Sequence, residues 1–82
     1  MDINTISFIP KEELQKIIGG NIRRIAYQKN INLMKLSEEI DMSYEYLRSI
    51  VSPKGKKQLS FYSLYKFSVV LDTTLDELIK SS

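Results

Sequence analysis

The sequence predicts an all-α domain of about five helices. Apolar residues recur at helical spacing in successive segments, proline or helix-capping residues stand where these segments begin, and no segment has the alternating pattern of a half-buried strand. The 82 residues leave room for one domain with a single small core. We therefore expect function to depend on one surface, without a separate catalytic or ligand-sensing module.

Residues 1–9 form a short N-terminal arm, which is apolar but has little helical period. Pro10 and the two glutamates at positions 12 and 13 mark the start of the main domain, residues 10–82, because both residue types suit the first turn of a helix. This first helix reaches Lys29, with Asn30 as its left-handed cap. The pair Gly19 and Gly20 weakens the helix, so we expect a kink or a close helix crossing there.

Residues 33–52 form a helix, a tight turn and a second helix. The two apolar stripes have helical spacing: Leu33, Leu36 and Ile40 in the first helix, and Leu47, Ile50 and Val51 in the second. Asp41 suits the left-handed position of the turn, while Asn32 and Ser43 can cap the two helices. Helices this short are unstable alone in water, so both stripes must be buried against the rest of the domain.

Two more helices complete the predicted fold. After a loop that contains proline and glycine, Ser60 caps a fourth helix whose apolar stripe is Leu64, Phe67 and Leu71. Thr74 and Glu77 form a capping box at the start of the last short helix, LDELI.

The missing residue types exclude several kinds of site. The chain has no cysteine and no histidine, which excludes disulfides, thiolate or imidazole metal sites, and nucleophiles paired with a histidine base. It also lacks a glycine-rich phosphate loop, and Glu38–Glu39 is best interpreted as a solvated helix face. We expect no enzyme activity, no cofactor and no small-molecule ligand. Without a leader peptide or a membrane-spanning run, we expect a cytoplasmic protein.

Positive charge is concentrated in one part of the chain. The net charge is only +2, but residues 43–66 contain five basic residues against a single acidic one, Glu45. The net charge alone is too small to indicate a polyanionic partner, but this local concentration of positive charge favours one. A solvated lysine-rich loop, SPKGKKQ, would give the same pattern, so the loop alone does not decide between the two interpretations.

Five segments follow one another as IGGNIRRIA, LMKLSEEI, DMS, YEYLRSIV and LSFYSLYKFSVVLDTTLDELI. In this order and spacing, residues 18–80 resemble the DNA-binding domain of the lambda-repressor and Cro-like (Xre-type) helix-turn-helix family. The resemblance implies a sequence-specific transcriptional regulator of bacterial or phage type. It also implies a homodimer bound to an inverted repeat in double-stranded DNA.

Some positions depart from the family pattern. Leu33 stands where the family often has a Gln that reaches a phosphate or a base. An Arg and a Glu commonly pair in the family, and here both are replaced, by Ala26 and Val51. Replacing both partners of a buried ion pair by apolar groups can be neutral or stabilising. We therefore expect Ala26 and Val51 to touch in the core. The family's turn glycines are replaced by residues that tolerate a left-handed conformation: Asn30, Asp41 and Asp72.

The resemblance makes residues 44–51 the recognition helix, which would enter the major groove. Its outward face would contact bases through Tyr44, Glu45, Arg48 and Ser49. The DNA backbone would be contacted by Ser43, Tyr46, Ser52, Lys54, Lys56, Lys57 and Ser60. Alternatively, these side chains are only solvated, and Glu45 pairs with Arg48 along the helix.

The fourth helix carries apolar residues at positions where the family is usually polar: Tyr62, Tyr65 and Val69. They suit a dimer interface, although scattered surface residues or a cover for the arm would give the same pattern. A hypothesis of a different class is a protein-interaction module. In that case the chain would be a helix-turn-helix antitoxin or adaptor that binds a partner protein through its apolar arm, Ile3 to Ile9.

Overall fold

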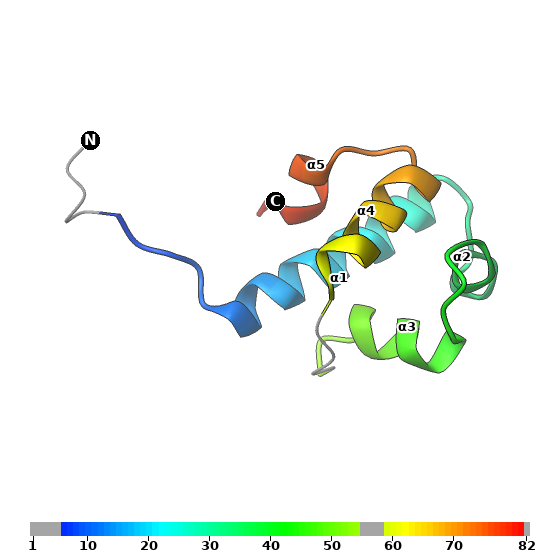
Figure 1. Ribbon diagram of the computed structural model, residues 1–82, viewed down its shortest axis with the longest axis horizontal. Coiled ribbons are helices and arrows are strands. Elements are labelled where there is room, and N and C mark those ends of the chain that lie inside the picture. Colours follow the sequence, from blue (N-terminus) through cyan, green and yellow to red (C-terminus); the bar gives the residue numbers. More distant parts are fainter. Residues whose placement is uncertain (1–5, 55–58, 82) are drawn as a thin grey trace.

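The computed structural model describes residues 6–54 and 59–81, and within these ranges it contains five helices and no strand (Figure 1). The helices are α1 (Lys11–Gln28), α2 (Leu33–Glu39), α3 (Tyr44–Val51), α4 (Phe61–Val70) and α5 (Leu75–Ile79). The predicted all-α class with five helices is confirmed. Residues 6–9, the described part of the arm, and Pro10 have no regular secondary structure, and this segment leads away from the helices (Figure 1).

The longest helix, α1, is the centre of the fold and packs against α2, α3 and α5. Its buried side contributes Ile18, Ile22, Ile25 and Ala26 to a single hydrophobic core. The other buried apolar residues of this core are Leu36, Ile40, Leu47, Ile50, Val51, Phe67, Leu71 and Leu78. The predicted inward stripes of the helices therefore meet in one cluster.

Three helices, α1, α2 and α4, end in the same kind of turn. The residues Asn30, Asp41 and Asp72 have φ angles of 59°, 55° and 51°. In each turn the next residue's N–H donates to a carbonyl five residues earlier, at 2.9 Å, 2.9 Å and 3.0 Å respectively. This is the Schellman motif, which provides donors for carbonyls at a helix end. The predicted left-handed conformation of these three residues is confirmed.

The predicted N-terminal caps are also confirmed for four helices. The side-chain oxygens of Asn32, Ser43, Ser60 and Thr74 each accept a hydrogen bond from the backbone N–H three residues later, at distances from 2.8 to 3.1 Å. Such a bond supplies an acceptor to one of the N–H groups that a helix leaves unpaired at its start. The boundaries of these helices thus follow from local sequence.

The close crossing predicted at the glycine pair occurs at Gly19, where α3 crosses α1. A Cβ atom at Gly19 would collide with the carbonyl oxygen of Ile50 and would lie 3.1 Å from Val51 Cα. A Cβ at Gly20 would meet no atom within 4 Å. Helix α1 is continuous through both residues, and the glycine pair accommodates the close crossing with α3. The alternative of a kink in α1 stays a prediction.

Ala26 and Val51 are 1% and 3% exposed and belong to the same core. Uncharged side chains suit both positions, since an unpaired Arg or Glu at either one would be buried. Direct contact between the two side chains stays a prediction.

The last helix, α5, is held to α1 by a buried amide that sequence reasoning did not single out. Asn21 is 4% exposed, and its Nδ2 donates to the carbonyl oxygens of Leu78 at 2.8 Å and Lys80 at 2.9 Å. Its Oδ1 accepts from Arg24 Nη2 at 3.2 Å. The amide provides donors for carbonyls at the end of α5, which would otherwise lack partners.

Candidate nucleic-acid interface

Helix α3 has an inner face fixed in the core and an outer face that is free to make contacts. Leu47, Ile50 and Val51 are buried on the inner face. On the outer face Glu45 and Arg48 are exposed, while Ser49 is half-buried. The crossing at Gly19 and the buried inner face fix the position of α3, so the outer side chains project from an anchored helix.

The Arg48 guanidinium does not pair with Glu45. Its Cζ atom lies 5.7 Å from the centroid of the Tyr44 ring, within the range of a cation–π contact. Among the residues that the structure describes, the ion pairs join Lys35 to Glu39 and Lys80 to Glu77. The alternative interpretation, in which Glu45 neutralises Arg48 along the helix, is therefore not what the structure contains.

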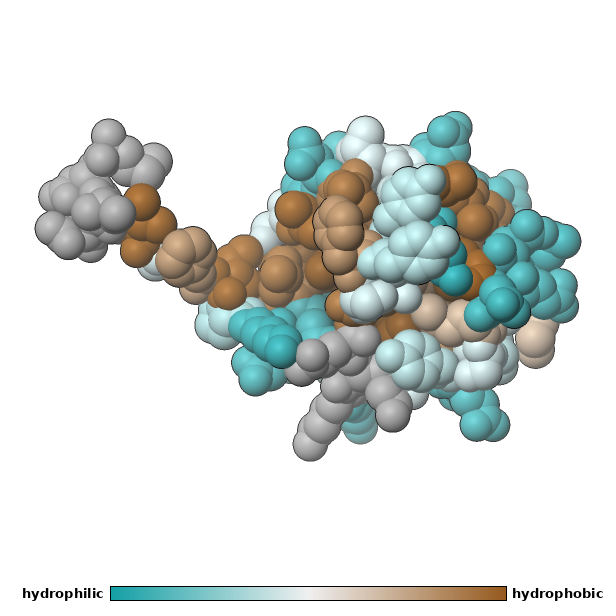
Figure 2. All heavy atoms as spheres, in the orientation of Figure 1, coloured by the Kyte–Doolittle hydropathy of each residue, from teal (hydrophilic) through white to brown (hydrophobic). Residues whose placement is uncertain are grey.

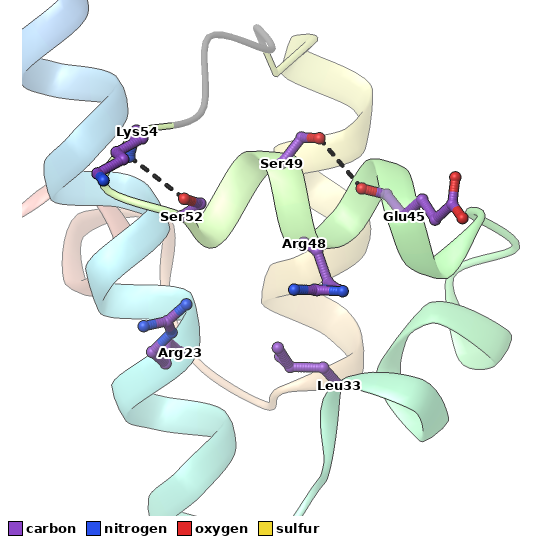
Figure 3. A pocket seen from close by; sticks show the side chains of 7 residues that line it. All are labelled: Arg23, Leu33, Glu45, Arg48, Ser49, Ser52 and Lys54. Atoms are coloured by element: carbon purple, nitrogen blue, oxygen red, sulfur yellow. Dashed lines mark hydrogen bonds between the residues drawn. The ribbon is translucent and has the colours of Figure 1, made fainter.

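Hydrogen bonds limit what the serines near α3 can offer a ligand. Ser49 Oγ donates to the backbone oxygen of Glu45 at 3.1 Å, so its lone pairs remain available and it faces a ligand as an acceptor (Figure 3). Ser52 Oγ accepts from the Lys54 N–H at 3.2 Å (Figure 3). Ser43 uses its oxygen to cap α3, which still leaves its hydroxyl hydrogen as a donor.

An open pocket of about 440 Å³ lies beside the outer face of α3 (Figure 3). Its lining residues come from α1, the start of α2, α3 and the turn that follows it: Arg23, Leu33, Glu45, Arg48, Ser49, Ser52 and Lys54. Five of them were predicted site residues, and the pocket brings them together. With three cationic side chains against one carboxylate, the pocket favours an anionic ligand.

Arg23 and Leu33 are the two lining residues that were not among the predicted contacts. Arg23 is exposed and comes from α1, and Leu33 is half-buried at the start of α2. Helical spacing is the sequence feature that could have identified Arg23 as a site residue. Arg23 lies four residues after Gly19, so both residues are on the side of α1 that faces α3. The sequence motif IGGNIRRIA alone does not separate Arg23 from its neighbour Arg24.

Four other predicted DNA contacts that the structure describes are not part of the lining of this pocket. Tyr44 is half-buried, and Ser43, Tyr46 and Ser60 are exposed. Lys56 and Lys57 lie outside the described residues, so their predicted phosphate contacts have no structural description here.

Lys66, another cation of the basic segment, points elsewhere. Its Nζ donates to the carbonyl oxygen of Ile40 at 2.7 Å and lies 5.5 Å from the Tyr62 ring centroid. A cation at this position stabilises the end of α2. Lys66 thus has a structural role within the fold.

The outer face of α4 is apolar and exposed. Tyr62, Tyr65 and Val69, the predicted dimer residues, are 66%, 50% and 59% exposed. The two tyrosine rings stack on each other, with centroids 6.0 Å apart and planes inclined by 26°. Phe61 is exposed at the start of the same helix and was not predicted as part of this surface. Figure 2 shows brown apolar patches on the helical body and along the arm.

Comparison of the chain with models of known families, with curated proteins and with solved structures gives no match. Within residues 6–54 and 59–81, none of the helices combines the length and the apolar character that a membrane span needs.

Proposed function

We propose that this protein is a sequence-specific DNA-binding regulator that inserts α3 into the major groove. The observation that carries the proposal is the two-sided environment of α3. Its inner face is locked against Gly19 of α1, and its outer face presents Arg48 and Glu45 in a pocket whose charged lining residues are three cations and one carboxylate. An anchored helix with exposed hydrogen-bonding groups is what readout in the major groove requires.

The outer face of α3 offers complementary chemistry to base edges. Arg48 has a planar fork of donors that matches the two acceptors of guanine, O6 and N7. Glu45 accepts from the cytosine amine, and Ser49, whose hydroxyl hydrogen is already donated to its own helix, acts as an acceptor as well. Tyr44 suits a thymine methyl group or a phosphate.

A second copy of the chain is the proposed partner of α4. Tyr62, Tyr65 and Val69 form an apolar outer face, and two-fold pairing through it would present two α3 helices to an inverted repeat. Aromatic side chains are enriched at interfaces between subunits. A cytoplasmic location is part of this proposal, because the regulator proposed is of bacterial or phage type.

Selection of binding sites from a random pool of DNA duplexes tests the proposed function. The full chain should enrich an inverted repeat whose half-sites contain a guanine. Fluorescence anisotropy should then show tighter binding to this duplex than to a scrambled one, with affinity falling as salt rises. If no sequence is enriched, and no duplex binds at low salt, the proposal is wrong.

A protein-interaction role for the arm is a second candidate, because Ile6, Phe8 and Ile9 are 44%, 88% and 46% exposed. In that role the chain would bind a partner protein, such as a toxin encoded beside it, through the arm. Co-purification of the two gene products should then require residues 1–9, whereas DNA binding should survive their removal. Co-purification that persists without residues 1–9 would exclude the arm as the contact.

A further inference from the structure

We infer that Arg23 of α1 binds a backbone phosphate of the DNA beside α3 and supplies affinity without sequence readout. This inference rests on the proposed function and adds a contact from a helix outside the helix-turn-helix unit. The site is the pocket between α1 and α3, and the ligand group is a phosphodiester oxygen.

The position of Arg23 is the first argument. Arg23 lines the pocket from α1, and Arg48 lines it from α3 (Figure 3). Leu33, from the start of α2, supplies only an apolar surface to the lining. Arg23 is therefore the one charged donor that α1 and α2 contribute to the lining of this pocket.

The neighbouring Arg24 shows that the two arginines are not equivalent. Arg24 donates to Asn21 Oδ1 at 3.2 Å and lines a different pocket, which includes Lys16 and Ser81. Successive helical residues project about 100° apart, so one arginine faces the end of α5 and the other faces α3. Only Arg23 is directed to the proposed DNA side.

The charge of the pocket is the second argument. Arg23, Arg48 and Lys54 meet only Glu45 as a counter-charge, and none of the ion pairs within the described ranges involves these three cations. An uncompensated cation cluster at an open surface attracts an anion. The guanidinium fork of Arg23 can bind two oxygens of one phosphate at the same time.

The geometry separates the roles of the two arginines. With α3 in the groove, base edges lie in front of α3, and the sugar-phosphate backbone borders the groove where the neighbouring helix stands. Arg48 projects from the inserted helix, whereas Arg23 projects from α1 beside it. Arg23 therefore meets the backbone, which carries no sequence information directly.

The test compares Arg23→Ala with Arg24→Ala, a matched control that removes the same charge from the adjacent position. Affinities of both variants and the wild type are measured by anisotropy on the selected duplex and on a scrambled duplex over a series of salt concentrations. Arg23→Ala should weaken binding to both duplexes by roughly tenfold per bound subunit. The slope of log affinity against log salt should fall by about 0.9 per lost phosphate contact. Arg24→Ala should change affinity by less than about twofold, because exposed charges outside the contact are screened.

Arg23→Lys separates charge from the geometry of the fork. Lysine binds phosphate as a point charge, so this variant should recover most of the affinity for the scrambled duplex. Circular dichroism melting of each variant checks that the fold is intact at the assay temperature.

Each outcome has one interpretation. If the wild type binds DNA but Arg23→Ala behaves like Arg24→Ala, Arg23 does not contact the backbone and the inference is overturned. If Arg23→Ala loses affinity only for the selected duplex, Arg23 reads bases, which also overturns it. If the wild type binds no duplex, the proposed function itself is refuted. This result is distinct from the two outcomes that overturn only the role of Arg23.

Discussion

Helices α3 and α4 have similar inner faces and very different outer faces. Both bury apolar residues in the same core, with Leu47 on α3 and Phe67 on α4 fully buried. The outer face of α3 is polar and charged, whereas that of α4 carries two stacked tyrosines and an exposed valine. Burial of the inner faces accounts for the stability of each helix, so the outer faces are free to be specialised.

The contrast assigns different partners to the two helices. Polar groups on α3 can exchange their bonds to water for bonds to base edges, since both are directional. The apolar atoms on α4 gain most from removal of water, which a complementary protein surface provides. We therefore expect substitutions on the inner faces to change stability and those on the outer faces to change binding.

The largest effect is expected for Phe67→Ala on the inner face of α4. Removing a fully buried ring leaves a cavity, which should lower the free energy of unfolding by roughly 3 to 5 kcal/mol. Tyr65→Ala on the outer face of the same helix is the control, and its effect on the monomer should stay within about 0.5 kcal/mol. Urea denaturation at low protein concentration measures both. Equal losses for the two variants would contradict the division into inner and outer faces.

The crossing of α1 and α3 can be tested with adjacent glycines. Gly19→Ala forces a methyl group against the Ile50 carbonyl, which should destabilise the fold by roughly 1 to 3 kcal/mol. Gly20→Ala enters open space and should stabilise it by about 0.5 to 1 kcal/mol, because alanine favours the helix. Thermal and urea unfolding compare the two. A Gly19→Ala variant as stable as Gly20→Ala would mean that the helices cross less closely.

Arg48→Ala tests the outer face of α3. The substitution should leave the unfolding transition unchanged and weaken binding by roughly 1 to 3 kcal/mol per half-site, mainly by relaxing the preference at one base position. Arg48→Lys should restore little of this preference, because an ammonium lacks the fork that matches guanine. Binding profiles over single-base variants of the selected duplex provide the measurement. A uniform loss at every position would assign Arg48 to the phosphate backbone.

Val69→Glu tests the outer face of α4 and has the smallest expected effect. A carboxylate on this face should weaken self-association by about 1 kcal/mol. The exposed position should leave the stability of the monomer nearly unchanged. Sedimentation of the wild type and the variant, with and without the selected duplex, measures the dimer. An unchanged dimer in the variant would place the interface elsewhere.

Local sequence was sufficient for the helices and their ends. Apolar spacing predicted the buried stripes, and Asn32, Ser43, Ser60 and Thr74 predicted where helices begin. The three left-handed turns were also predictable, because asparagine and aspartate tolerate a positive φ better than most residues do. These features depend on contacts within a few residues along the chain.

Contacts between distant segments were decided only by the tertiary structure. The sequence indicated that the glycine pair allows a close approach between helices. Which of the two glycines meets α3 depends on how α1 is rotated about its own axis. The same rotation decides that Arg23, and not Arg24, lines the pocket beside α3. Nothing in the sequence singled out Asn21 or separated Lys66 from the other basic residues. The structure shows that they donate to the carbonyls of Leu78 and Ile40, 57 and 26 residues away. The physical reason is that helical periodicity sets the relative direction of side chains on one helix, whereas packing of all five helices in one core sets what each side chain meets.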